Sequence, residues 1–166
     1  MTDTRRRGAQ IADAEAQTRA WEAIKAEERA GRGEPPDDSV LAGISRGLPE
    51  WTRALKLQQR AATMGFDWPS AGPVLDKLAE ELAELRAEFA RGSAPDRLED
   101  ELGDILFVVV NLARHAKVDF SRALRHANGK FERRFRSMER LAQGHLAELD
   151  LAAQEVLWQS AKQQER

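Results

Sequence analysis

The sequence predicts an all-α protein. Apolar residues recur at helical spacing, Gly and Pro gather in short segments between these stretches, and no stretch shows convincing β-strand alternation. The 166 residues are enough for one domain with a real core. A hydrophobic content of 42% with a charged content of 33% is typical of a water-soluble, helix-rich protein.

The N-terminal part of the chain is the least regular. Residues 1–12 are basic and have nothing to bury, so we expect a flexible arm there. Residues 13–29 are charged and rich in Ala, and they predict a helix. Gly and Pro then indicate a linker over residues 31–38, and the short segment 39–48 is ambiguous.

The rest of the chain predicts five helices. Pro49 suits the first turn of one helix and Gly65 its end, Pro73 opens the next, and Asp96 can cap the third. Because the connection at residues 92–95 is short, the helices on either side of it should be antiparallel neighbours. The expected helices cover about residues 50–64, 74–91, 97–116, 120–141 and 150–162.

Two acidic segments, twenty residues apart, share the pattern L-x-x-E-L-x-[D/E]-[L/I]. On a helix their apolar residues fall within about 60° of arc, and the acids lie at the border of that stripe. Residues three apart share a helix face, so each segment presents a pair of carboxylates beside its buried side. The pairs are Glu81 with Glu84 and Glu101 with Asp104.

The second acidic segment runs into residues 105–113, which are apolar almost all round, so we expect this helix to be buried on most sides. Val108 should share the face of the acids, where we expect no Lys or Arg one turn away. Acids there cost several kcal/mol unless something compensates them. Four carboxylates without Cys or a neighbouring His suit Mg²⁺ or Mn²⁺. The alternative is an ordinary solvated acidic face.

Candidate substrate-binding residues lie nearer the C-terminus. Lys130 and Arg134 share one helical face beside two phenylalanines at the same spacing. A cationic face beside an acidic metal site suits a polyphosphate, although an amphipathic helix with solvated arginines is the alternative. Trp158 and Lys162 repeat the pairing of an aromatic residue with a cation. The Trp could stack on a base, or simply pin the last helix.

Several features are absent from the sequence. Without Cys there is no thiol nucleophile, disulfide or zinc–thiolate site, which fits the cytoplasmic location that we expect. A net charge of −2 gives no general attraction to nucleic acid or membrane. No signal peptide, membrane span, P-loop or nucleophile elbow is expected. The three histidines are dispersed and lack ligand spacing.

At these residues the chain resembles the MazG family of nucleoside triphosphate pyrophosphohydrolases, whose signature is E-E-x-x-E followed by E-x-x-D. Here the signature is Glu80-Glu81-x-x-Glu84 and Glu101-x-x-Asp104. Residues 53–62, 65–69, 103–107, 110–115 and 130–135 also resemble the catalytic C-terminal half of MazG. The likeness runs from about residue 13 to residue 162. It implies an antiparallel helical bundle assembled as a homodimer or higher homo-oligomer.

Typical MazG chains carry two related domains. The resemblance therefore implies that residues 13–48 correspond to an interdomain segment and residues 49–166 to a catalytic domain. Gly129, inside an otherwise family-like segment, is a departure that should soften its helix by up to about 1 kcal/mol.

The resemblance also implies roles for residues of this chain. Mg²⁺ would be held by Glu81, Glu84, Glu101 and Asp104. The implied nucleotide-binding residues are Lys77, Glu80, Glu81, Arg97, Glu99, Asp100, Lys130, Arg134, Trp158 and Lys162. The implied reaction cleaves an NTP or dNTP between the α and β phosphates, giving a monophosphate and pyrophosphate.

For the mechanism, we expect a metal-activated water to attack phosphorus while Lys130 and Arg134 stabilise the developing charge. Glu80 is a candidate to accept the proton of that water. One alternative is a non-catalytic helical dimerisation or regulatory module derived from a two-domain MazG. Another is nucleic-acid binding, which would depend strongly on salt. Family members range from broad NTP hydrolysis to housecleaning of damaged nucleotides, and the sequence ranks no base or sugar.

Overall fold

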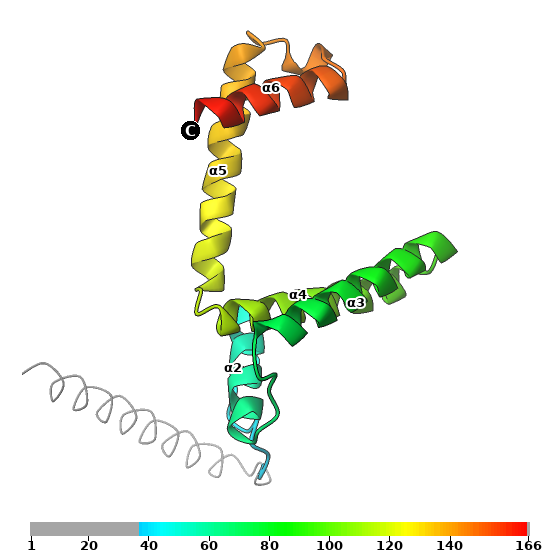
Figure 1. Ribbon diagram of the computed structural model, residues 1–166, viewed down its shortest axis with the longest axis vertical. Helices are drawn as coiled ribbons and strands as arrows, with labels where there is room; N and C mark the ends of the chain where they lie inside the picture. The colour runs from blue at the N-terminus through cyan, green and yellow to red at the C-terminus, as the bar shows by residue number, and fades with distance from the viewer. Residues whose placement is uncertain (1–36, 166) are drawn as a thin grey trace, which may run out of the picture. The chain divides into compact units, whose positions relative to one another are not determined.

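The computed structural model describes residues 37–165, and all of their regular structure is helical (Figure 1), which confirms the all-α prediction. The expected arm, the helix over residues 13–29 and most of the linker lie outside the described residues. The helices are α2 (Glu50–Thr63), α3 (Ala71–Arg91), α4 (Pro95–His115), α5 (Phe120–Leu141) and α6 (Leu151–Gln164), with a 3₁₀ turn η1 (Leu146–Glu148).

The helix boundaries differ from the predicted ones by a few residues. α3 begins at Ala71, two residues before Pro73. The first turn can include this proline, because the N–H that proline lacks would have no partner inside the helix at that position. The sequence suggested that Asp96 caps α4, but the helix already begins at Pro95, whose fixed φ suits the first helical position. Asp96 lies in the first turn, where its charge still favours the helix.

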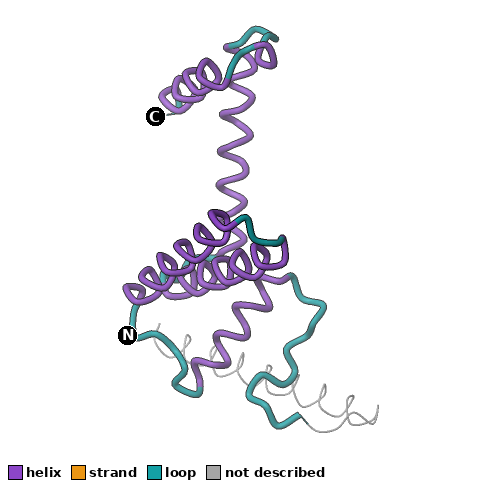
Figure 2. Tube along the Cα trace, turned by 90° about the vertical axis from the view of Figure 1, so that its right-hand side faces the viewer, coloured by secondary structure: helices purple, strands orange, loops and turns teal. Residues whose placement is uncertain are grey.

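The described residues form two compact units, which divide between Phe107 and Val108. In the first unit, α3 and the beginning of α4 run antiparallel, side by side (Figures 1 and 2). Gly92 makes the turn between them in the left-handed conformation, with φ of 65°, and its N–H donates to the last carbonyls of α3. This turn places the two acidic segments on facing helices.

Helix α2 is joined to α4 by a buried polar contact. The Nε2 of Gln58 donates to the backbone carbonyl of Phe107 at 2.8 Å, and the Gln58 side chain is almost fully buried. Val74, near the start of α3, is completely buried. The Gln58 contact holds α2 against α4, which carries half of the acidic residues.

The second unit is built on the packing of α6 against α5 (Figure 1). The rings of Phe131 and Trp158 lie 5.5 Å apart, and Ser137 Oγ donates to the side-chain oxygen of Gln164 at 3.2 Å. Asp150 caps α6 by accepting a hydrogen bond from the backbone N–H of Ala153 at 2.8 Å. The aromatic pair and the hydrogen bond together hold α6 on α5.

The expectation that α4 is buried on most sides is wrong for the described chain. Val108 and Val110 are buried, whereas Leu102, Leu106 and Phe107 are 46%, 60% and 42% exposed. A helix that is apolar all round needs neighbours on all sides, and residues 37–165 cover only part of its circumference. No helix among these residues is both long and apolar enough to cross a lipid bilayer.

Candidate metal and phosphate sites

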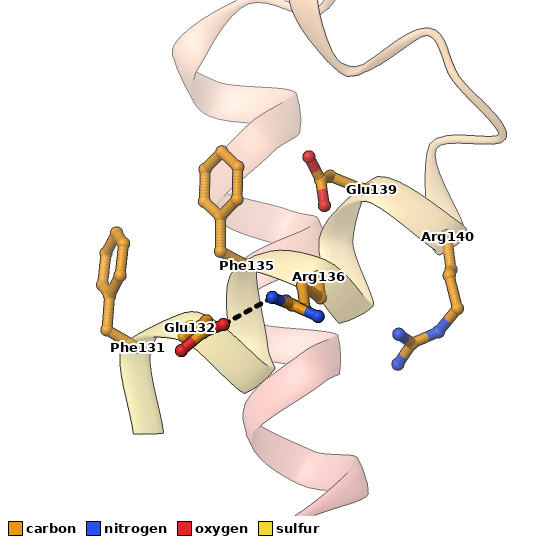
Figure 3. A pocket seen from close by; sticks show the side chains of 6 residues that line it. All are labelled: Phe131, Glu132, Phe135, Arg136, Glu139 and Arg140. Atoms are coloured by element: carbon orange, nitrogen blue, oxygen red, sulfur yellow. Dashed lines mark hydrogen bonds and ion pairs between the residues drawn. The ribbon is translucent and has the colours of Figure 1, made fainter. Parts of the chain in front are cut away.

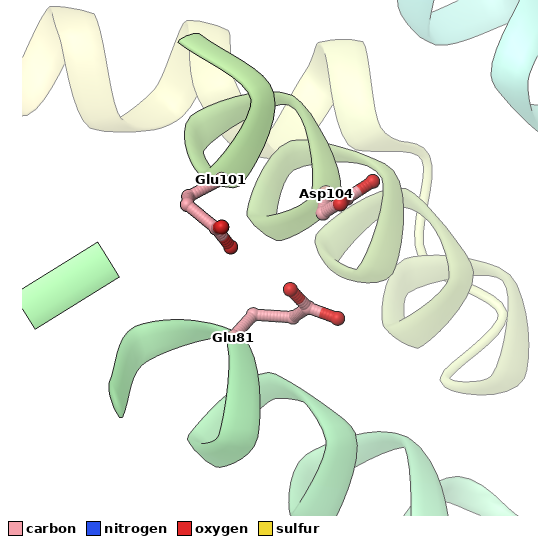
Figure 4. A group of neighbouring side chains, drawn as sticks. All are labelled: Glu81, Glu101 and Asp104. Atoms are coloured by element: carbon pink, nitrogen blue, oxygen red, sulfur yellow. The ribbon is translucent and has the colours of Figure 1, made fainter. Parts of the chain in front are cut away.

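Three of the four predicted metal ligands come together in the first unit. Glu81 from α3, with Glu101 and Asp104 from α4, each place a carboxylate oxygen within 4.8 Å of the others (Figure 4). Glu81 and Glu101 are buried, and Asp104 is exposed. Residues three apart lie on one helix face, so Glu101 and Asp104 both point toward α3. We call Glu81, Glu101 and Asp104 the acidic cluster.

Within this cluster, Glu81 has an oxygen without a hydrogen-bond partner. Its Oε1 lies 2.8 Å from the ammonium group of Lys77, whereas its Oε2 is buried and accepts no hydrogen bond from the described residues. An unsatisfied buried acceptor costs about 1–3 kcal/mol, and more when it is charged. A divalent cation bound between the three carboxylates would satisfy this oxygen, so the residues present fit a hard cation.

Two cations partly balance the acidic cluster, so the expectation of no Lys or Arg one turn away is wrong. Arg97 lies one turn before Glu101, and its guanidinium reaches the Glu101 carboxylate at 3.4 Å. Helical side chains lean toward the N-terminus, which brings Glu101 back over the turn of Arg97. Lys77 lies between Glu80 and Glu81, 2.8 Å from each, and these two hydrogen bonds, that to Glu80 first, raise its pKa.

Arg97 also connects the cluster to the turn between α3 and α4. Its guanidinium lies 3.6 Å from the buried carboxylate of Glu88, which also pairs with Arg91 at 2.8 Å. The hydroxyl of Ser93 donates to Glu88, and this hydrogen bond is the main reason why the pKa of Glu88 is lowered. The charged network therefore runs from the helix turn to the edge of the acidic cluster.

Glu84, the fourth predicted ligand, is not part of the three-residue cluster, and its side chain is exposed. Its pKa is nevertheless raised, first by desolvation and then by the negative charges of Glu81 and Glu101. Glu84 therefore lies within electrostatic reach of the cluster. Of the other predicted residues of this unit, Glu80 pairs with Lys77, Asp100 lies 3.7 Å from Arg97, and Glu99 is exposed.

Two of the predicted phosphate-binding residues of the second unit, Arg134 and Trp158, are in contact. The guanidinium carbon of Arg134 lies 5.7 Å from the centre of the Trp158 ring. Trp158 also packs on Phe131, which agrees with the simpler interpretation that it pins the last helix. Lys130 is exposed and Lys162 is half-buried.

Sequence reasoning missed Glu165, which contributes the closest ion pair to Arg134. Its Oε2 accepts a hydrogen bond from the Nε of Arg134 at 2.7 Å, and its Oε1 accepts one from the Nε of Arg133 at 3.3 Å. A signal was present in the sequence, because Glu165 lies about one turn after Lys162 and two turns after Trp158. Nothing in its spacing to α5, however, indicates that the two would meet.

A separate hollow of about 790 Å³ lies along α5 (Figure 3). The rings of Phe131 and Phe135 project from this helix and lie 5.8 Å apart, and both side chains are exposed. The charged part of the hollow contains an ion pair between Glu132 and Arg136. The hollow is lined by Phe131, Glu132, Phe135, Arg136, Glu139 and Arg140. No predicted phosphate-binding residue lines it, and both acidic and basic side chains do.

Comparison with known proteins places these sites in one family. The family model described as the MazG nucleotide pyrophosphohydrolase domain matches residues 72–138, which contain the acidic cluster and Arg134. The chain is 47% identical, over 150 residues, to a protein of Escherichia coli K12 named nucleoside triphosphate pyrophosphohydrolase. It is 37% identical, over 145 residues, to a Thermotoga maritima protein named nucleoside triphosphate pyrophosphohydrolase/pyrophosphatase MazG.

The matches cover most of this chain but only part of each relative. They include 87% of the chain and 56% of the Escherichia coli protein, and 86% of the chain and 54% of the Thermotoga maritima protein. The chain thus spans little more than half the length of these relatives. The matched domain, together with this identity over nearly the whole chain, shows that residues 72–138 form a domain of the MazG family.

Proposed function

We propose that the chain is a Mg²⁺-dependent nucleoside triphosphate pyrophosphohydrolase that cleaves NTPs or dNTPs between the α and β phosphates. The observation that supports this most directly is the buried, unpartnered Oε2 of Glu81 within the acidic cluster. The names of the relatives add support, because both describe nucleoside triphosphate pyrophosphohydrolases. We assign the activity to residues 49–166.

Glu81, Glu101 and Asp104 would hold Mg²⁺, with Mn²⁺ as a substitute. Glu84 would be recruited as the fourth ligand, because a cation bound at the acidic cluster would favour the charged form of its carboxyl group. When bound, the cation supplies polarisation of phosphate oxygens and a more acidic water. Glu80 lies beside the cluster on α3 and would accept the proton of the attacking water.

Positive side chains would hold the phosphates. Lys77 and Arg97 neutralise acidic residues in the described chain. A cation at the cluster would take over this task, leaving both side chains available to the nucleotide, together with the neighbouring Glu99 and Asp100. In the second unit, Arg134 and Lys130 would bind phosphate oxygens, and Trp158 and Lys162 would close the pocket.

The active form would be a homo-oligomer. Leu75, Leu82 and Phe89 lie seven residues apart on α3 and are 50% to 62% exposed. A spacing of seven keeps these side chains on one helix face, and Leu102 and Leu106 add exposed apolar surface on α4. A second copy of the chain packed on these helices would cover both surfaces and complete the expected helical bundle.

The test is pyrophosphate release from a panel of NTPs and dNTPs, with Mg²⁺ and with EDTA. Equal amounts of nucleoside monophosphate and pyrophosphate, formed only with Mg²⁺, would support the proposal, and the ranking of the panel would give the base and sugar preference. Release of inorganic phosphate would contradict the bond assignment. No release by folded, metal-loaded protein would instead favour a non-catalytic dimerisation or regulatory module.

A further inference from the structure

Glu165 directly follows α6 and lies between two arginines of α5. It divides its carboxylate between them, with Oε2 on the Nε of Arg134 and Oε1 on the Nε of Arg133. A negative charge at a helix C-terminus is unfavourable with respect to the helix dipole. The hydrogen bond from Arg134 nevertheless lowers the pKa of Glu165, so its carboxyl group is ionised at neutral pH. The two arginines therefore compensate for the unfavourable position of Glu165.

Arg134 is held in one orientation by two contacts. Its Nε bonds Glu165, and its guanidinium lies 5.7 Å from the centre of the Trp158 ring. Within residues 37–165 these contacts use only one of the five guanidinium N–H groups. The two terminal nitrogens, which can form parallel hydrogen bonds with a phosphate, are not used by the Glu165 contact. Arg134 is also mostly covered, with 20% of its side chain exposed.

The geometry distinguishes between two roles for Glu165. A carboxylate that fully occupies an arginine in place of phosphate would form two parallel hydrogen bonds with that one guanidinium group. Glu165 instead bonds the Nε atoms of two arginines with one oxygen each. This arrangement fixes both side chains through their Nε atoms and leaves their terminal nitrogens unused by Glu165.

We propose that Glu165 is a positioning residue for phosphate binding, which holds Arg134, and with it Arg133, so that their terminal nitrogens meet the phosphate chain of a nucleotide. This inference rests on the proposed function, in which Arg134 binds phosphate. It also brings in Arg133, whose exposed side chain becomes a second phosphate contact through its bond to the same carboxylate.

The test is the Glu165→Gln variant of the full chain, which keeps the shape of the side chain and removes its charge. The dissociation constant of an α,β-methylene nucleoside triphosphate analogue with Mg²⁺ should rise about tenfold, the lower end of the range for lost outer-shell partners. KM should rise with it while kcat changes less. Glu155→Gln, which removes an exposed acid elsewhere on α6, is the matched control and should change none of these values.

A double-mutant cycle separates positioning from a merely structural role. In an Arg134→Ala background, Glu165→Gln should cause no further loss of affinity, and Glu165→Asp in the otherwise unchanged chain should restore part of it. An unchanged or tighter affinity in Glu165→Gln would overturn the inference, as would a loss that simply adds to that of Arg134→Ala.

Because analogue binding needs no turnover, the two proposals can fail separately. A chain that binds the analogue but releases no pyrophosphate would refute the proposed function, and the cycle would still decide the role of Glu165. A chain that hydrolyses nucleotides but binds them equally well with Gln at 165 would refute only the positioning role. A chain that binds no nucleotide would refute both.

Discussion

Replacing Glu81 with Gln should remove most of the stabilisation that Mg²⁺ gives to the protein. The change removes the charge from the buried side chain that contributes the unpartnered Oε2 to the acidic cluster. Without metal, the variant should melt close to the parent chain. Repulsion from Glu101 and Asp104 is lost together with the attraction of Lys77, and these two effects oppose each other.

The magnitude follows from linkage between metal binding and folding. A cation at 100 times its Kd stabilises the folded state by about 2.7 kcal/mol, which corresponds to about 5–10 °C in Tm for a domain of this size. Loss of a direct ligand should weaken binding at least as much as loss of an outer-shell partner, by about 10- to 100-fold. The remaining stabilisation at the same Mg²⁺ concentration is then about 0.4–1.4 kcal/mol.

The assay is thermal unfolding followed by circular dichroism, with EDTA and with increasing Mg²⁺, in the absence of nucleotide. The parent chain and the control Glu155→Gln should show the full rise in Tm, and Glu81→Gln at most about half of it. An equal rise in all three proteins would show that Mg²⁺ binds elsewhere, and the assignment of the acidic cluster would be refuted.

Three further predictions concern stability and assembly. Ser93→Ala removes the hydrogen bond that lowers the pKa of Glu88 in the folded protein. A lowered folded-state pKa stabilises the fold above the unfolded-state pKa, so the variant should have a lower Tm than the parent at pH 7. The two Tm values should converge as the pH falls through the folded-state pKa of Glu88. Gly92→Ala should lower the free energy of unfolding by about 1 kcal/mol, because Gly92 has a φ of 65°. Gly129→Ala should raise it by about 0.5–1 kcal/mol, because Gly129 lies inside α5 and the added Cβ would make only an ordinary contact. Thermal melts of both variants check these signs. Leu82→Glu should reduce the mass measured by sedimentation to that of one 18.6 kDa chain, and an oligomer that survives it would exclude the exposed face of α3 as the interface.

The local features of the fold were predictable because they depend on neighbouring residues. Helical spacing predicted five helices to within a few residues, and Gly92 ended α3 in the left-handed conformation that glycine favours. The 3₁₀ turn η1 was not predicted, since three residues are too few for a periodic pattern. The acidic pairs were also predictable from neighbouring residues, because a spacing of three residues places both acids of a pair on one helix face.

The arrangement between helices was less predictable. The sequence pattern predicted both Glu81 and Glu84 as metal ligands, but only Glu81 joins the acidic cluster with the acids of α4. The pattern does not distinguish the two residues, because the separation and register of two helices depend on how they pack. The contact of Arg97 with Glu101 depends on the lean of helical side chains toward the N-terminus, which the spacing of backbone positions does not show.

The all-α class, the positions of the helices and the place of the acidic residues at the border of an apolar stripe could all be predicted from the sequence. Each of these follows from the period of one helix and needs no knowledge of its neighbours. The tertiary structure alone decided which three carboxylates meet, that one buried oxygen of Glu81 lacks a partner, and that Glu165 holds Arg134. The physical reason is that these contacts join residues on different helices, whose relative position is set by packing and not by spacing along the chain.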